Sequence, residues 1–216
     1  MDLWARQSHG FSSSEGGTTK RRPRARRRVG WLRYINDFTS PADAEKNVGP
    51  ALSAGTPYII HLCEGTDIET RDYFDNLKKA DGSSLIGPPL VTIHCVALDG
   101  PQFQTLATNR GAGVVWSPLS NFLLYGATTK VALPRQAGLP VAIGCDWAPS
   151  GTKNLLGELK ITKLVSDHEG GLFTDQELID AVTHVPASMI GWDSYVGSIE
   201  RDKAADLVVR EEPPSG

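Results

Sequence analysis

Three apolar, β-rich runs in this chain end on a reactive polar side chain, and this repetition most constrains the fold. Residues 57–60 lead into His61, residues 90–93 into His94 and residues 139–143 into Asp146. Continuous apolar runs are typical of strands buried on both faces, as in a parallel sheet. Polar groups at the carboxyl ends of such strands are where barrel enzymes carry their catalytic residues. The pattern therefore predicts a functional site at one edge of a parallel sheet.

Segments with helical spacing separate these strands. Ser40 is expected to cap the first helix, Pro41 to occupy its first position, and Gly55 to end it. Further strands are expected at residues 31–35 and 113–116, and helices at residues 40–54, 66–79, 101–108, 128–137, 154–166 and 174–184. Units of roughly 30 residues favour a (β/α)8-type barrel. An open doubly wound sheet is the alternative, although the chain lacks the glycine-rich phosphate loop typical of that fold.

Composition places the chain among ordinary globular proteins. It has 216 residues, of which 40% are hydrophobic and 22% charged, enough for one sizeable core. No apolar run approaches the roughly 20 residues of a membrane span, and we expect no secretory signal. Its three cysteines, Cys63, Cys95 and Cys145, are too far apart to suggest a disulfide framework. We interpret them as packing residues and predict a cytoplasmic location.

The charge is distributed unevenly. Residues 1–28 contain eight Lys or Arg against only two acidic residues, while the whole chain carries a net charge of −3. This first segment has no apolar periodicity and is predicted to be a disordered basic arm. A basic arm can contact phosphates, but this one has no interleaved aromatics and precedes no nucleic-acid recognition motif. We therefore expect neither a nucleic-acid partner nor a membrane partner.

Each polar residue at a strand end has a structural alternative when it is considered alone. A histidine there is often a buried packing residue, and an aspartate often caps the next turn. Glu64, three residues after His61, is costly to bury unless it meets a cation, a metal-bound water or a substrate proton. Taken together, two histidines and two carboxylates are the inventory of a hydrolytic metal centre, in which imidazole and carboxylate bind the ion and a free glutamate carries the proton.

Several ordered motifs carry a family resemblance. Pro-Tyr-Ile-Ile-His-Leu-Cys-Glu at 57–64 is followed by Ile-His-Cys at 93–95, Ser-Pro-Leu-Ser-Asn at 117–121 and Gly-Cys-Asp-Trp at 144–147. The tail contains Gly-Ser-Ile-Glu at 197–200 and Lys-Ala-Ala-Asp-Leu-Val-Val at 203–209. Over about residues 50–210 the chain resembles the second half of an amidohydrolase-superfamily enzyme. The most similar branch contains cytosine deaminase, guanine deaminase and chlorotriazine hydrolase.

The resemblance implies an α/β fold: the C-terminal half of a TIM-type (β/α)8 metal-dependent hydrolase barrel, with the last strand of a small β-sandwich domain. The expected divisions are a disordered arm over residues 1–28, the partial barrel over 29–195 and the sandwich remnant with its tail over 196–216. The implied substrate is a small molecule with a carbon–nitrogen bond.

The resemblance also implies a role for each site residue. His61 and Asp146 match metal ligands, and the ion is zinc or iron. Glu64 matches the general acid/base, His94 matches the histidine that orients the hydrolytic water or the substrate, and Asp146 also accepts the proton of that water. The implied reaction is hydrolysis of a non-peptide carbon–nitrogen bond by a metal-activated water, such as deamination or amide hydrolysis.

One departure from the family pattern affects these expectations. The family has a His-x-His pair that supplies two metal ligands, and this chain has no such pair. We therefore expect a C-terminal fragment with an impaired site that binds the ion weakly or loses it. The alternative is an inactive fragment or an interaction protein. An incomplete barrel also has open sheet edges, which predicts oligomerisation or aggregation through them.

Overall fold

The computed structural model describes residues 38–209, which form a four-stranded parallel sheet and the helices that connect its strands. The strands are β1 (Tyr58–Leu62), β2 (Leu90–His94), β3 (Gly113–Trp116) and β4 (Val141–Ile143). Their spatial order is β1-β2-β3-β4, the same as their order in the chain. A doubly wound sheet reverses direction at a switch point, so this sequential order excludes that alternative for the described sheet and matches the wall of a (β/α) barrel.

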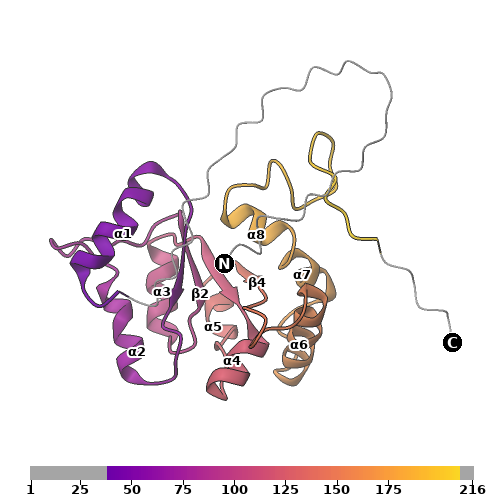
Figure 1. Cartoon of the computed structure of the whole chain (residues 1–216), viewed down its shortest axis with the longest axis horizontal. Coiled ribbons are helices and arrows are strands. Elements are labelled where there is room, and N and C mark those ends of the chain that lie inside the picture. The colour runs from indigo at the N-terminus through magenta and orange to yellow at the C-terminus, as the bar shows by residue number, and fades with distance from the viewer. Residues whose placement is uncertain (1–37, 210–216) are drawn as a thin grey trace.

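Helices follow or precede every strand and flank the sheet, as Figure 1 shows. Their bounds are α1 (Pro41–Ala54), α2 (Ile68–Asp72), the 3-10 helix η1 (Tyr73–Asn76), α3 (Gly100–Thr108), α4 (Pro118–Tyr125), α5 (Ala132–Gln136), α6 (Leu155–His168), α7 (Asp175–Asp180) and α8 (His184–Met189). No helix between residues 38 and 209 is long and apolar enough to cross a bilayer.

The first helix forms as its sequence predicts. The Ser40 hydroxyl accepts a hydrogen bond from the Asp43 amide at 3.2 Å, which satisfies one of the free N–H groups of the first turn. Gly55 ends the helix with φ 61°, a left-handed conformation that glycine adopts without a Cβ penalty. Ala44 and Val48, four residues apart, are fully buried on the face that packs against the core.

The two faces of the sheet are covered differently. Ile60, Leu62 and Val114 point into the large apolar core beneath the connecting helices. The opposite face carries Val91 and Ala142, and α8 packs there through Met189. Because side chains alternate along a strand, this division follows from the register that pairs Ile59 with Val91 and Val115 with Ala142.

The structure confirms the predicted strands over 57–63, 90–95, 113–116 and 139–145 to within two residues at each end. Several helix predictions were less accurate. The segment 66–79 forms only α2 and η1, residues 128–137 form only the short α5, and 174–184 is divided between α7 and α8. Helix α4 was not predicted at all.

Some predictions fall outside the described residues or remain untested. The basic arm at 1–28 and the strand at 31–35 lie outside residues 38–209. Residues 196–209 contain no strand in the part of the chain that the structure describes. A sandwich strand requires partner strands, so the sandwich remnant and the domain boundaries stay predictions.

Strands β1 and β4 are the edges of the described sheet. The outer side of β4 is not entirely free, because the Ile143 amide donates a hydrogen bond to the Ala181 carbonyl at 2.9 Å. The turn between α7 and α8 thus covers part of this edge, as natural sheets commonly do to limit edge-to-edge pairing. Association through the edges remains a prediction.

Gly113 allows β3 to lie close to α8, and replacing it with a larger residue should destabilise the fold. A Cβ at this position would lie 2.6 Å from the Pro140 carbonyl oxygen and 3.0 Å from Cε of Met189, and φ is +144°. We expect Gly113→Ala to lower the free energy of unfolding by about 1–3 kcal/mol in urea titrations. Gly100→Ala is the matched control, since nothing lies within 4 Å of the added carbon. Equal stability of the two variants would contradict the close packing.

Candidate metal centre

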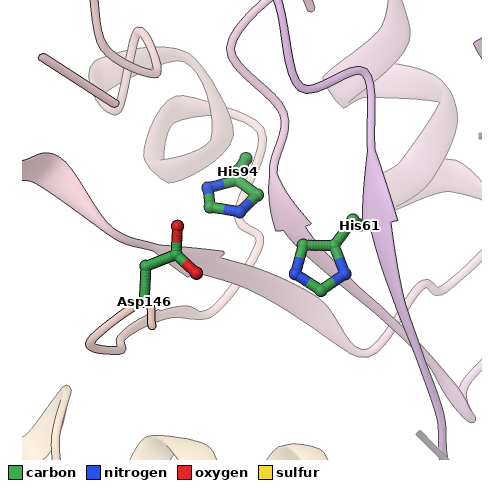
Figure 2. Close-up of side chains that lie close together, drawn as sticks. All are labelled: His61, His94 and Asp146. Atoms are coloured by element: carbon green, nitrogen blue, oxygen red, sulfur yellow. The ribbon is translucent and has the colours of Figure 1, made fainter. Parts of the chain in front are cut away.

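The carboxyl ends of three strands bring His61, His94 and Asp146 together. His61 lies near the end of β1, His94 is the last residue of β2, and Asp146 follows β4. The register pairs His61 with Ile93 and Leu62 with His94. One possible ligand atom from each of the three side chains lies within 4.8 Å of the others, and Figure 2 shows the side chains converging. The imidazole centroids are 5.2 Å apart.

Left-handed backbone is concentrated where these strands end. Cys63 after β1 has φ 51°, and His94 and Cys95 at the end of β2 have φ 65° and 57°. Such conformations cost on the order of 1–3 kcal/mol each for residues with a side chain, and they persist where surrounding contacts hold them. The Cys95 amide donates to the Leu62 carbonyl at 3.0 Å, which joins the two strand ends.

Glu64 faces the same centre from the loop after β1. Its Oε1 lies 3.4 Å from Nε2 of His94, and 16% of its side chain is exposed. Burial raises the pKa of this carboxyl, while a hydrogen bond with Tyr125 acts in the opposite direction. A carboxyl group with a raised pKa beside two imidazoles is suited to accept a proton and return it near neutral pH.

Burial lowers the pKa of both histidines, and the neighbouring His94 adds to the effect on His61. Both side chains are therefore favoured as neutral imidazoles, the form that binds metal. In the described part of the chain, Nε2 of His94 is buried and has no hydrogen-bond partner, since its contact with Glu64 lacks hydrogen-bond geometry. An unsatisfied buried nitrogen beside a second imidazole and a carboxylate fits a divalent ion with nitrogen and oxygen ligands, such as zinc.

Hydroxyl groups hold the Asp146 carboxylate in place. Its Oδ2 accepts hydrogen bonds from Ser120 at 2.5 Å and from Ser150 at 3.3 Å, and its Oδ1 accepts one from the Trp147 amide at 2.8 Å. Both serines are buried. Sequence reasoning did not identify them as site residues, although Ser120 lies inside the Ser-Pro-Leu-Ser-Asn motif.

A second buried carboxylate, Glu158 on α6, connects the loops of the site. Its Oε1 accepts from the Leu119 amide at 3.0 Å, at the start of α4. Its Oε2 accepts from the Thr152 hydroxyl at 2.6 Å, in the loop that carries Asp146. Sequence reasoning missed this role. The only available signal was an acidic residue among apolar ones in the first turn of a helix.

The three cysteines support their interpretation as packing residues. All are free; Cys63 and Cys95 are fully buried, and Cys145 is partly buried. Burial raises the pKa of the Cys145 thiol, which disfavours a reactive thiolate. Its Sγ lies 3.5 Å from the Thr152 hydroxyl, a contact within the loop that carries Asp146.

Glu158→Gln should weaken the link between the two loops. The amide has only one acceptor oxygen and no charge, so hydrogen bonds to a buried carboxylate are lost, typically worth about 1.5–3 kcal/mol in unfolding free energy. Glu169→Gln, whose parent side chain is 57% exposed, is the control and should change stability by less than about 0.5 kcal/mol. Urea unfolding measures both. A loss in both variants, or in neither, would show that Glu158 is not an anchor.

The lowered pKa values of both histidines predict that the metal-free chain loses stability as the pH falls through 6.5, their usual value. Below that pH the unfolded chain binds protons on both imidazoles, and the folded chain resists protonation. Urea midpoints should therefore be lower about one pH unit below 6.5 than one unit above it.

The raised pKa of Glu64 has the opposite effect: it lowers the stability of the folded chain as the pH rises above 4.5, the usual pKa of a glutamate. The effect of the histidines is therefore best measured in a Glu64→Gln background. In that background His94→Gln should reduce the acid-side loss. Thr92→Val, a buried change on the same strand, should leave the loss intact. A pH-independent midpoint would contradict the assignment.

Comparisons with known proteins agree with this geometry. The family model of the Amidohydrolase family matches residues 46–214. A 5-methylthioadenosine/S-adenosylhomocysteine deaminase of Symbiobacterium thermophilum is 30% identical over 190 residues, covering 80% of this chain and 42% of the relative.

Two solved structures share the fold. The match to Escherichia coli guanine deaminase has a TM-score of 0.65 at 23% identity, and it covers 80% of this chain and 41% of the guanine deaminase chain. Zinc-complexed atrazine chlorohydrolase from Arthrobacter aurescens has a TM-score of 0.64 at 16% identity, with coverages of 78% and 39%. The chain thus spans about two fifths of the length of the proteins it matches. The family model that matches residues 46–214 and the 30% identical deaminase show that this chain belongs to the amidohydrolase family, in the deaminase and chlorotriazine hydrolase-like branch predicted from its motifs.

Proposed function

We propose that this chain binds one divalent metal ion through His61, His94 and Asp146, and that the site hydrolyses a carbon–nitrogen bond of a small molecule. The observation that carries the proposal is the convergence of these three ligand atoms within 4.8 Å, with Glu64 in contact with His94. Two neutral imidazoles and one carboxylate are a typical ligand set for catalytic zinc. Zinc is accordingly the proposed ion, and iron is the alternative.

This proposal differs from the expectation from sequence in the role of His94. The resemblance assigned metal binding to His61 and Asp146 and assigned His94 to orienting the water or substrate. The unsatisfied buried Nε2 of His94 supports its use as a third ligand. Three ligands rather than two remove the main reason to expect only weak binding, because catalytic zinc sites usually have three protein ligands.

We assign the proton transfers of the reaction to carboxylates of this chain. A bound divalent ion activates water as a Lewis acid. The Glu64 carboxylate takes a proton from the attacking water and returns it to the departing nitrogen, a task that suits a carboxyl group with a raised pKa. Asp146 provides a second acceptor, and the hydroxyls of Ser120 and Ser150 keep its carboxylate facing the centre.

The proposed reaction is deamination of an aminated heterocycle. The relatives named above are deaminases of a purine nucleoside derivative and of guanine, and a chlorohydrolase of a triazine. All three substrates are nitrogen heterocycles that carry a group displaced by water. We also propose a cytoplasmic location, where three free cysteines remain reduced.

A second candidate is a metal-binding protein without turnover. The five histidines of the sequence include no His-x-His pair, and the chain spans only 42% of the first relative. Under this candidate the ion would bind while the groups that complete catalysis would have to come from another chain. Metal content and turnover must therefore be measured separately.

We expect the full chain, loaded with zinc and gel-filtered, to retain nearly stoichiometric metal and to release ammonia from an adenosine, guanine or aminotriazine substrate. His61→Ala and Asp146→Ala should lose both metal and turnover. Glu64→Gln should keep the metal but lose about 10²–10⁴-fold in rate, because an amide cannot carry the proton. Glu69→Gln, an exposed change in α2 five residues further along the chain, is the control.

The outcomes separate the candidates. Metal retained by the parent without ammonia release supports the second candidate. A parent that binds no metal contradicts both. A rate for Glu64→Gln close to that of Glu69→Gln would remove Glu64 from the mechanism.

A further inference from the structure

The side of His94 that faces away from the metal centre is held by a closed ring of hydrogen bonds. His94 Nδ1 contacts Oδ1 of Asn121 at 2.9 Å. The Asn121 amide nitrogen lies 3.1 Å from the Thr129 hydroxyl oxygen, and that hydroxyl donates to the backbone carbonyl of His94 at 2.5 Å. His94, Asn121 and Thr129 are all buried. We call this ring the Asn121 relay.

The direction of every hydrogen bond in the relay follows from its one fixed end. A backbone carbonyl can only accept a hydrogen bond, so the Thr129 hydroxyl must donate its single proton to the carbonyl oxygen of His94. The Thr129 oxygen then has only acceptor capacity left, and it must face the NH2 group of Asn121. The Asn121 oxygen consequently faces His94, where it can only accept.

A second threonine provides an acceptor for the other hydrogen of the Asn121 amide. The Thr128 hydroxyl oxygen accepts from Nε1 of Trp116 at 2.7 Å and lies 3.4 Å from the Asn121 amide nitrogen. Both hydrogens of the Asn121 amide thus have acceptors. A flipped amide would place two acceptor oxygens, those of Asn121 and Thr129, 3.1 Å apart in a buried site, which is costly.

We infer that the Asn121 relay fixes His94 in the tautomer protonated on Nδ1, so that the lone pair of Nε2 always faces the metal centre. Asn121 is therefore a positioning residue, which acts through His94 and does not touch substrate. The use of this lone pair for metal rests on the proposed function; the tautomer itself rests only on the hydrogen-bond ring. It also explains why Nε2 is buried with no hydrogen-bond partner among the described residues.

The left-handed end of β2 is part of the same device. His94 has φ 65°, and its carbonyl is the acceptor that sets the direction of the ring. His94 thus supplies both the backbone carbonyl at the fixed end of the relay and the imidazole that the relay orients. Backbone strain at this position is offset by a hydrogen bond that also selects the tautomer.

Nitrogen-15 NMR of the full, metal-free chain with labelled histidine tests the relay at neutral pH. We expect the His94 signals to show a protonated Nδ1 and an unprotonated Nε2. Asn121→Leu and Thr129→Val should abolish the fixed tautomer, and Thr129→Ser should restore it because serine keeps the hydroxyl. A proton on Nε2 in the parent, or a tautomer unchanged in Asn121→Leu and Thr129→Val, overturns the inference.

Thr92→Val is the matched control. Thr92 is also buried on β2, and its hydroxyl donates to the Gly113 carbonyl at 3.1 Å, outside the relay. Thr92→Val and Thr129→Val each lose one buried hydroxyl-to-carbonyl hydrogen bond, but only Thr129→Val should change the tautomer. If Asn121→Leu does not fold, the Thr129→Val, Thr129→Ser and Thr92→Val series still decides the result.

Cobalt titration of the same variants adds a readout that depends on the proposed function. We expect Asn121→Leu and Thr129→Val to bind Co²⁺ about 10–100-fold more weakly than the parent, as is typical when the hydrogen-bond partner of a metal-binding histidine is lost. Thr92→Val and Thr129→Ser should bind like the parent. If the parent binds no Co²⁺ but shows the predicted tautomer, the proposed function fails and the relay stands.

Discussion

The parallel pairing of β1 with β2 is the constraint on which the site depends. The register pairs His61 with Ile93 and Leu62 with His94, so the two histidines lie one position apart along the sheet. The left-handed backbone at His94, with φ 65°, ends β2 at a point where the two rings lie 5.2 Å apart. A slip of one residue would turn a whole strand over and move its histidine to the other face. The buried apolar residues on both faces oppose such a slip, so the core of the fold also protects the geometry of the site.

Buried polar side chains then convert the position of each strand end into a defined orientation. Glu158 joins the start of α4 to the loop after β4, and Asn121 joins α4 to the end of β2. Helix α4 is therefore connected to both halves of the site. A buried polar group is costly unless every hydrogen bond is made, which is why such networks allow only one arrangement. The short α4 thus carries side chains that orient both His94 and Asp146.

The sequence predicted where chemistry lies better than how it is oriented. Strand-end residues His61, Glu64, His94 and Asp146 were identified because apolar runs mark buried strands and parallel strands place their ends together. The proposed role of His94 as a third ligand did not come from the sequence, because spacing along a chain does not reveal which ring nitrogen faces the centre. Ser120, Asn121 and Glu158 were missed for a related reason: each contacts a site element that is 26 to 39 residues away in the sequence.

The errors in the helices have a local physical origin. Helix α4 begins with Pro118, a residue that usually signals a break but is also favoured in the first turn of a helix. Helix α5 begins late because Thr128 and Thr129 use their side chains in contacts with Trp116, Asn121 and His94 instead of extending a helix. Before α5, tertiary contacts of the site thus override local helix propensity. Two of the segments where prediction from sequence failed, α4 and the residues before α5, carry side chains that contact His94 or Asp146, as expected where the needs of a site rather than local preference set the conformation.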